Sequence, residues 1–220
     1  MPLQILTAIL PESVAPWLAM IGFGAYHGLN PGMGWLFALS LGLQRRSERA
    51  IWLPLLPIAA GHAASLAVVA VIVLAAGQLL STTVLEVTTA LALLGFGAYK
   101  VVHYYRHPRW VGMNVGLRDL TWWSFLMAMA HGAGLMIAPA LIGIAAAQHA
   151  HHSHGGAGLG VSLGVAAHTA SMLLVMMVVA WFVYKRFGLA ILRQRWVNFD
   201  LIWAVALIIV GGIALVSALV

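Results

Sequence analysis

The feature that most constrains this chain is a series of six long apolar stretches separated by short, more polar segments. A helix that spans a membrane needs about 20 predominantly apolar residues, and each stretch reaches that length. The stretches cover residues 17–43, 51–77, 84–104, 122–147, 158–184 and 199–219. The sequence therefore predicts an all-α membrane protein with six transmembrane helices.

The composition excludes ordinary soluble domains and nucleic-acid binding. Hydrophobic residues make up 63% of the chain and charged residues 7%, whereas soluble domains carry about 25% charged residues. The net charge of +6 does not form a basic polar face, because the basic residues lie in short clusters between apolar runs. The absence of cysteine removes disulfides and thiolate metal sites. We expect the lipid bilayer as partner and no nucleic acid.

The basic residues also predict an orientation. All eleven lie in or beside the segments that follow the first, third and fifth stretches. The positive-inside rule makes these segments cytoplasmic and puts both termini outside. We expect an integral multi-pass protein of a bacterial inner (plasma) membrane. Tryptophans near the same helix ends are interpreted as an interfacial belt: Trp52, Trp110, Trp122, Trp123, Trp181, Trp196 and Trp203.

Two short motifs recur in the same order in the two halves of the chain. His27-Gly28 is repeated as His131-Gly132, and the A-x-H-x-A-S motif at residues 60–65 is repeated at 166–171. The offsets of the histidines, 104 and 106 residues, nearly agree. Chance recurrence in an alanine-rich chain is the alternative, and the agreement in spacing favours a true duplication.

The duplication predicts one transmembrane domain over residues 1–220, with repeat one at about 13–104 and repeat two at about 121–219. Each half holds three spans, an odd number, so the two halves have opposite orientations. Inverted repeats are typical of secondary transporters, which bind substrate near the membrane midplane at the repeat interface.

Four histidines, His27, His62, His131 and His168, lie deep in these stretches. Counting along the helices places His62 and His131 on the cytoplasmic side of the membrane centre and His27 and His168 on the outer side. Ionisable groups at such depth mark functional sites, and neutral imidazole is the commonest metal ligand. A single histidine could serve only to hydrogen-bond a neighbouring helix, but four at repeated positions favour a shared metal site.

Other residues accompany the histidines. Asn30 and Met33 are further candidate contacts for the metal, and three hydroxyl residues are predicted either to orient the imidazoles or to bond to their own helices: Ser65, Thr169 and Ser171. Glycines and prolines predict hinges or close helix packing at Gly28, Pro31, Gly32, Gly34, Gly132 and Pro139. Such irregular backbone is tolerated in a membrane where it is buried in protein or lines a cavity.

The outer segment between the halves is rich in histidine: His149, His151, His152 and His154. Tracts of this kind can capture metal ions. The alternative is a flexible, solvated loop in which the histidines have no role.

Two of these motifs resemble a known family. G-A-Y-H-G-L-N-P-G-M-G at residues 24–34 resembles the first-helix signature of the NicO-type nickel/cobalt transporters, and G-H-A-A-S at 61–65 resembles a stretch of the related permeases. The resemblance implies a secondary transporter of the LysE-like superfamily, with His27 and His62 contacting the metal. The family usually has a second histidine, and often an aspartate, in the first motif. These positions are Met33 and Asn30 here, which leaves nickel, cobalt, zinc and the softer Cu(I) open.

Three functions are therefore compared. The first is a transporter that moves a transition-metal cation as its substrate. The second is a b-type membrane cytochrome with paired axial histidines on haem. The third, an intramembrane enzyme, is disfavoured because no nucleophile or acid lies near the histidines, so no catalytic residue is predicted. The direction of transport and homo-oligomerisation stay open.

Overall fold

A computed structural model describes residues 14–103, 116–149, 156–187 and 199–220. All regular structure in these ranges is helical, which confirms the all-α prediction for the described part of the chain. The elements are α2 (Ala15–Leu29), η1 (Pro31–Met33), α3 (Trp35–Arg45), α4 (Arg49–Trp52), α5 (Leu55–Gly77), α6 (Thr82–His103), α7 (Leu117–His131), α8 (Ala133–His149), α9 (Gly156–Arg186) and α10 (Phe199–Leu219).

Several helices have the length and composition of membrane spans. Among the described residues four qualify alone, namely Arg49–Gly77, Thr82–His103, Gly158–Arg186 and Leu201–Leu219. Leu117–His131 and Ala133–Ala147 qualify together as a fifth span, bent by 72°. These features are those of an integral membrane protein with several spans.

The first predicted span, residues 17–43, is divided by a short break. α2 ends at Leu29, and Asn30 is extended, with its side-chain oxygen accepting a hydrogen bond from the Gly32 amide at 2.9 Å. Pro31 begins one turn of 3₁₀-helix, where its missing amide proton costs no hydrogen bond. Gly34 then has a φ of 126°, a conformation that side chains strongly disfavour, before α3 begins.

The fourth predicted span, residues 122–147, is also broken. α7 ends at His131, and Gly132 takes the left-handed conformation with a φ of 71° before α8 begins. Pro139, which the sequence suggests as a second hinge, lies within α8. The break is at Gly132 because glycine alone adopts this backbone conformation without steric cost.

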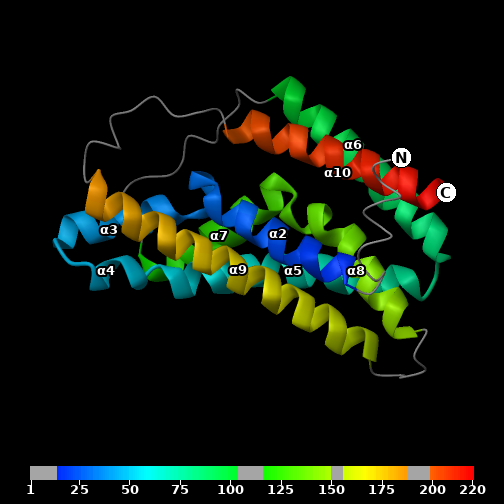
Figure 1. Cartoon of the computed structure of the whole chain (residues 1–220), viewed down its shortest axis with the longest axis horizontal. Coiled ribbons are helices and arrows are strands. Elements are labelled where there is room, and N and C mark those ends of the chain that lie inside the picture. Colours follow the sequence, from blue (N-terminus) through cyan, green and yellow to red (C-terminus); the bar gives the residue numbers. More distant parts are fainter. Residues whose placement is uncertain (1–13, 104–115, 150–155, 188–198) are drawn as a thin grey trace.

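The helices pack mainly in three pairs: α2 with α9, α5 with α7, and α6 with α10 (Figure 1). Glycines allow the closest approaches. A methyl group at Gly24 of α2 would lie 2.3 Å from the carbonyl oxygen of His168 in α9. A methyl group at Gly61 of α5 would lie 2.1 Å from the carbonyl oxygen of Thr121 in α7. The backbones of both pairs are therefore in direct contact.

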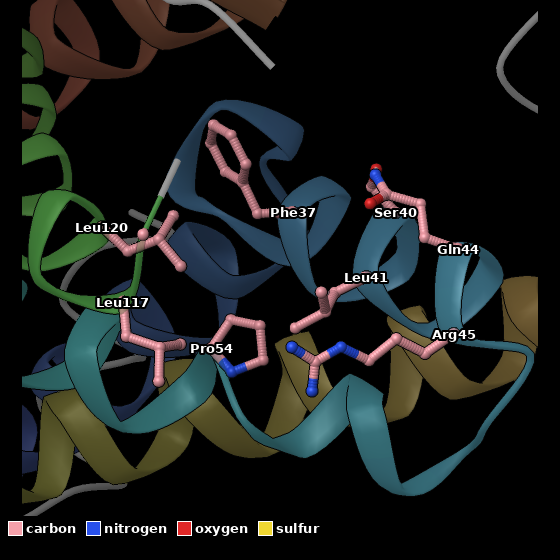
Figure 2. Close-up of a pocket in the computed structure, with 9 residues that line it drawn as sticks. Phe37, Ser40, Leu41, Gln44, Arg45, Pro54, Leu117 and Leu120 are labelled. Carbon is pink, nitrogen blue, oxygen red and sulfur yellow. The ribbon is translucent and has the colours of Figure 1, made fainter. Parts of the chain in front are cut away.

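Several basic segments meet at one end of the molecule. Lys185, near the end of α9, forms an ion pair with Glu48, which directly precedes α4. A cavity of about 170 Å³ at the same end brings Arg45 of α3 beside Gly116 and Leu117 at the start of α7 (Figure 2). The ends of α3 and α9 and the start of α7 therefore lie at the same end of the bundle.

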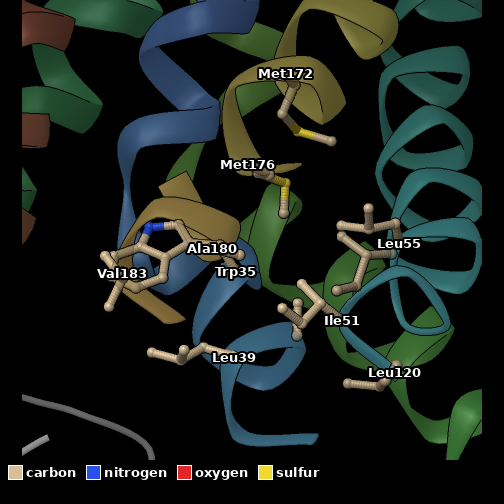
Figure 3. Packing of buried hydrophobic residues seen from close by; sticks show 11 residues of the cluster. Trp35, Leu39, Ile51, Leu55, Leu120, Met172, Met176, Ala180 and Val183 are labelled. Carbon is tan, nitrogen blue, oxygen red and sulfur yellow. The ribbon is translucent and has the colours of Figure 1, made fainter. Parts of the chain in front are cut away.

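An apolar cluster fills the space between this end and the middle of the bundle (Figure 3). It joins Trp35 and Leu39 of α3 to Met172 and Met176 of α9.

Trp203 of α10, predicted as a belt residue, lies instead in the interior with 1% of its surface exposed. Its position near the start of an apolar stretch suggested the interface, but the α6–α10 pair turns it towards the other helices.

Candidate metal centre

Three of the predicted histidines meet in the interior of the bundle. His27 of α2, His62 of α5 and His168 of α9 are buried, with 0%, 1% and 0% exposed surface. One ring nitrogen of each lies within 4.8 Å of those of the other two. The rings are in mutual contact, with centroids 4.9 to 5.5 Å apart. Three helices that are distant in sequence therefore converge on one cluster, the His27–His62–His168 triad.

Backbone carbonyls orient two of these imidazoles. Nδ1 of His27 lies 2.6 Å from the carbonyl oxygen of Phe23, and Nδ1 of His168 lies 3.1 Å from that of Met20. A carbonyl oxygen can only accept, so in both rings Nδ1 carries the proton. Nε2 is then left with a free lone pair, as a metal ligand requires.

The Nε2 atoms of the triad have few competing partners. Nε2 of His27 is buried and has no hydrogen-bond partner within the described ranges. Nε2 of His62 and Nε2 of His168 lie 3.4 Å apart and share one hydrogen bond, in which His62 donates because Nε2 of His168 carries no proton. Nitrogens bound to a tetrahedral ion at about 2.0–2.1 Å are about 3.3 Å apart. The spacing of this pair therefore suits a first-row transition metal.

The donors of the triad are all neutral. In the part of the chain that the structure describes, no carboxylate belongs to this group of ligands. A bound cation would therefore keep its charge within a buried environment, and the solvation cost rises steeply with that charge. Burial without a carboxylate therefore penalises a divalent cation more than a monovalent one.

His131, the fourth predicted ligand, lies outside the triad. It is buried, with 6% exposed surface, and its Nδ1 lies 2.8 Å from the carbonyl oxygen of Met127. Its Nε2 is directed to the break between α2 and α3, 4.0 Å from where a methyl group on Gly32 would lie. Counting along the helices predicted that His62 and His168 lie on opposite sides of the membrane centre, yet their Nε2 atoms are 3.4 Å apart, because the helices cross and the side chains reach towards each other.

Asn30 and Met33, predicted as further metal contacts, have structural partners. The Asn30 side chain caps η1 through the Gly32 amide. Met33 is buried in an apolar cluster with Met136 and Trp203. Both residues shape the helix break beside the triad.

The three predicted orienting residues differ from one another. Thr169 donates to the carbonyl oxygen of Val165 in its own helix at 2.8 Å. Ser171 donates across the helix pair to the carbonyl oxygen of Ile21 at 2.8 Å, a partner that the sequence did not indicate. The buried Ser65 hydroxyl has no hydrogen-bond partner among the residues described.

Two other predictions concern packing and the outer segment. Gly28, predicted as a hinge, is helical, and a methyl group there would lie 2.4 Å from the carbonyl oxygen of Met172, so it serves close packing. His149 is the last residue of α8. His151, His152 and His154 lie outside the described residues.

Trp203 is the main site residue that sequence reasoning missed. Its ring contacts His27 edge to face at a centroid distance of 4.4 Å and His131 at 6.0 Å, and it stacks on Tyr26. Its indole N–H donates to the carbonyl oxygen of His131. That carbonyl is at the end of α7, where helix carbonyls lack a partner in their own helix. The one available signal was a large aromatic residue within an apolar stretch.

Comparison with known proteins identifies no relative. No family model, no curated protein and no solved structure matches the chain. The chemistry and geometry of the triad are therefore the basis for a functional proposal.

Proposed function

We propose that this protein is a secondary transporter that moves a transition-metal cation across the membrane through the His27–His62–His168 triad. The observation that carries the proposal is the convergence of three buried imidazole nitrogens within 4.8 Å from three apolar helices. A buried cluster of this kind is costly in a membrane unless it binds something. Neutral imidazole is a suitable ligand for copper, nickel, cobalt and zinc.

The proposed architecture has six spans arranged as two inverted repeats, with the basic end in the cytoplasm. The first span would comprise α2 and α3, and the fourth would comprise α7 and α8. The packing supports this arrangement, because exchanging the repeats converts the pair α2–α9 into α7–α5 and α6–α10 into itself. His27 and His131 also bond in the same way to the carbonyl four residues before them.

The two breaks support transport. Backbone distortion inside a membrane is tolerated where it is buried in protein or lines a cavity, and transporters form their substrate sites from such discontinuous helices. Here one break follows His27 and the other follows His131 directly. Together with the two motifs, this makes the NicO-type transporters the family we propose.

The neutral donor set bears on the ion. Among the candidates, Cu(I) carries the smallest charge, so it is the cation that we expect to be moved best. Protons compete with the metal for the imidazole lone pairs, so transport would be coupled to or inhibited by protons.

The arrangement is less suitable for haem. A macrocycle between His62 and His168 needs space beside the axial nitrogens, and the ring of His27 contacts both of these residues there. We therefore propose no haem and no enzymatic reaction for this chain.

The test measures metal content, visible absorption and transport of the purified protein. In proteoliposomes we expect uptake of Cu(I), or of another of the four ions, and a loss of binding and transport in His62→Ala and His168→Ala. His103→Ala is the matched control, because its Nδ1 also bonds the carbonyl four residues earlier but lies at the end of α6. Parental transport by His62→Ala, or a haem absorption band, would overturn the proposal.

A further inference from the structure

His62 and His168 occupy equivalent positions in the two repeats and yet contact each other directly. Their rings are nearly parallel, with an interplanar angle of 3°, and their Nε2 atoms are 3.4 Å apart. When two residues related by a two-fold operation touch, they lie on either side of its axis. This pair is therefore central to both halves.

His27 and His131 are also equivalent in the repeats, but only one of them joins the central pair. The ring of His27 contacts both His62 and His168. The ring of His131 contacts Trp203, whose other contacts include the ring of His27. Both histidines hold Nδ1 against the carbonyl oxygen four residues earlier, at 2.6 Å for His27 and 2.8 Å for His131.

A second pair of equivalent residues shows the same inequality. Ser171 donates to the carbonyl oxygen of Ile21 and so ties α9 to α2. Its counterpart Ser65 is fully buried, and its hydroxyl has no hydrogen bond to any described residue. The half of the site that contains His27 is therefore the more tightly bonded one.

From these inequalities we infer that the ion stays on His62 and His168 while His27 and His131 alternate as the third ligand. One ligand set serves each of the two states of the transporter. Inverted repeats produce two access states by moving one repeat against the other around a fixed site, and exchanging the two halves converts the His27 set into the His131 set. The inference rests on the proposed function.

Trp203 lies in the path of this exchange. It is buried, contacts both alternating histidines and holds the carbonyl of His131 through its indole N–H. An exchange of the two histidines would therefore alter the contacts of this ring. α10, which carries Trp203 and packs along α6, is therefore the element whose displacement accompanies the change of state.

The experiment compares equilibrium binding of Cu(I) in detergent with transport in proteoliposomes. His62→Ala and His168→Ala remove a ligand from both states. Loss of a residue that only orients a ligand typically lowers metal affinity by about 10–100-fold, and we expect these variants to lose at least as much. His131→Ala should bind like the parental protein, since the described state does not use it, but should not transport. His27→Ala should show an intermediate loss of affinity, and the double variant with His131→Ala a greater one.

His131→Asn guards against a folding defect, because its amide can still donate to the carbonyl of Met127 while the imidazole is absent. Both His131 variants should transport no metal, and His103→Ala should behave as the parent. Parental transport by His131→Asn would overturn the inference, as would a loss of affinity equal to that of His62→Ala. A parental protein that binds no metal would instead refute the proposed function itself.

Discussion

Nε2 of His62 and Nε2 of His168 lie 3.4 Å apart, although 106 residues separate them in the chain. Both belong to copies of the same six-residue motif, so the fold brings a duplicated sequence face to face. Two neutral imidazoles in contact form one hydrogen bond, and an ion bound by both Nε2 atoms displaces it as the proton of the donating ring moves to its Nδ1. In the function that we propose, this pair would bind the metal without a large rearrangement of its rings.

Gly24→Ala should destabilise the protein and displace His168. The new methyl group would lie 2.3 Å from the His168 carbonyl oxygen, and α2 and α9 must separate to admit it. We expect a loss of about 1–3 kcal/mol, as for overpacking of a core, together with weaker metal binding. Gly22→Ala is the control in the same helix, since a methyl group there meets nothing within 4 Å. Equal thermal unfolding midpoints for the two variants would contradict the close packing.

Gly132→Ala should disturb the break between α7 and α8. Its φ of 71° costs an L-residue about 1–2 kcal/mol, and the methyl group would also lie 2.6 Å from the ring of Phe96. The measurement is the thermal unfolding midpoint in detergent. Gly212→Ala, which meets nothing within 4 Å in α10, should be neutral. A more stable Gly132→Ala variant would show that no break is needed there.

Trp203→Phe should leave an aromatic ring against His27 but remove the indole N–H. The carbonyl oxygen of His131 then loses its donor, and an unsatisfied buried group costs about 1–3 kcal/mol. We expect a lower unfolding midpoint with metal binding retained. Trp122→Phe, at a residue that is 61% exposed, should leave both quantities unchanged. If the two variants unfold at the same temperature, the indole contributes no such bond.

The ion pair of Glu48 with Lys185 should make stability depend on acid. The hydrogen bond from Lys185 holds the pKa of Glu48 below its ordinary value of 4.5. Because the pKa of Glu48 is lower in the folded protein than in the unfolded one, the ion pair stabilises the fold at pH values above 4.5. This stabilisation is lost as the pH falls through the lowered pKa of the folded protein. The parental protein should therefore unfold at a higher temperature than Glu48→Gln at neutral pH, and this difference should shrink below pH 4.5.

Added salt should reduce the difference in unfolding temperature between the parental protein and Glu48→Gln. The two side chains are 45% and 46% exposed, and such pairs contribute little and are screened. Lys185→Gln should reproduce the Glu48→Gln result. A difference in unfolding temperature that grows in acid would contradict the assignment of the pair.

Much of the helical arrangement was predictable from local sequence. The apolar stretches coincide with helices or broken pairs of helices, because length and hydropathy alone decide where a chain can cross a bilayer. The break after Asn30 followed from Pro31 and the glycines around it. The break at Gly132 was harder to place, since Pro139 carries the stronger local signal and is yet accommodated inside α8.

The site was predictable in part. His27, His62 and His168 could be selected because ionisable residues are rare in apolar helices. His131 is not part of the triad and contacts Trp203 instead. Trp203 lies on α10 and packs against residues of other helices, and no local sequence pattern indicates which way its ring faces. The hydrogen bond of Ser171 to Ile21 depends on the close crossing of α2 and α9. Gly24 makes this crossing possible, but the presence of a glycine does not predict which helix will pack against it.

The unequal hydroxyls of Ser65 and Ser171 have a thermodynamic consequence. In a cycle that exchanges the two repeats, the hydrogen bond made by Ser171 would be broken while its counterpart at Ser65 forms. Each end state then has one satisfied and one unsatisfied hydroxyl, so this contribution cancels between them. In the transport cycle that we propose, the two serine hydroxyls would therefore favour neither state over the other.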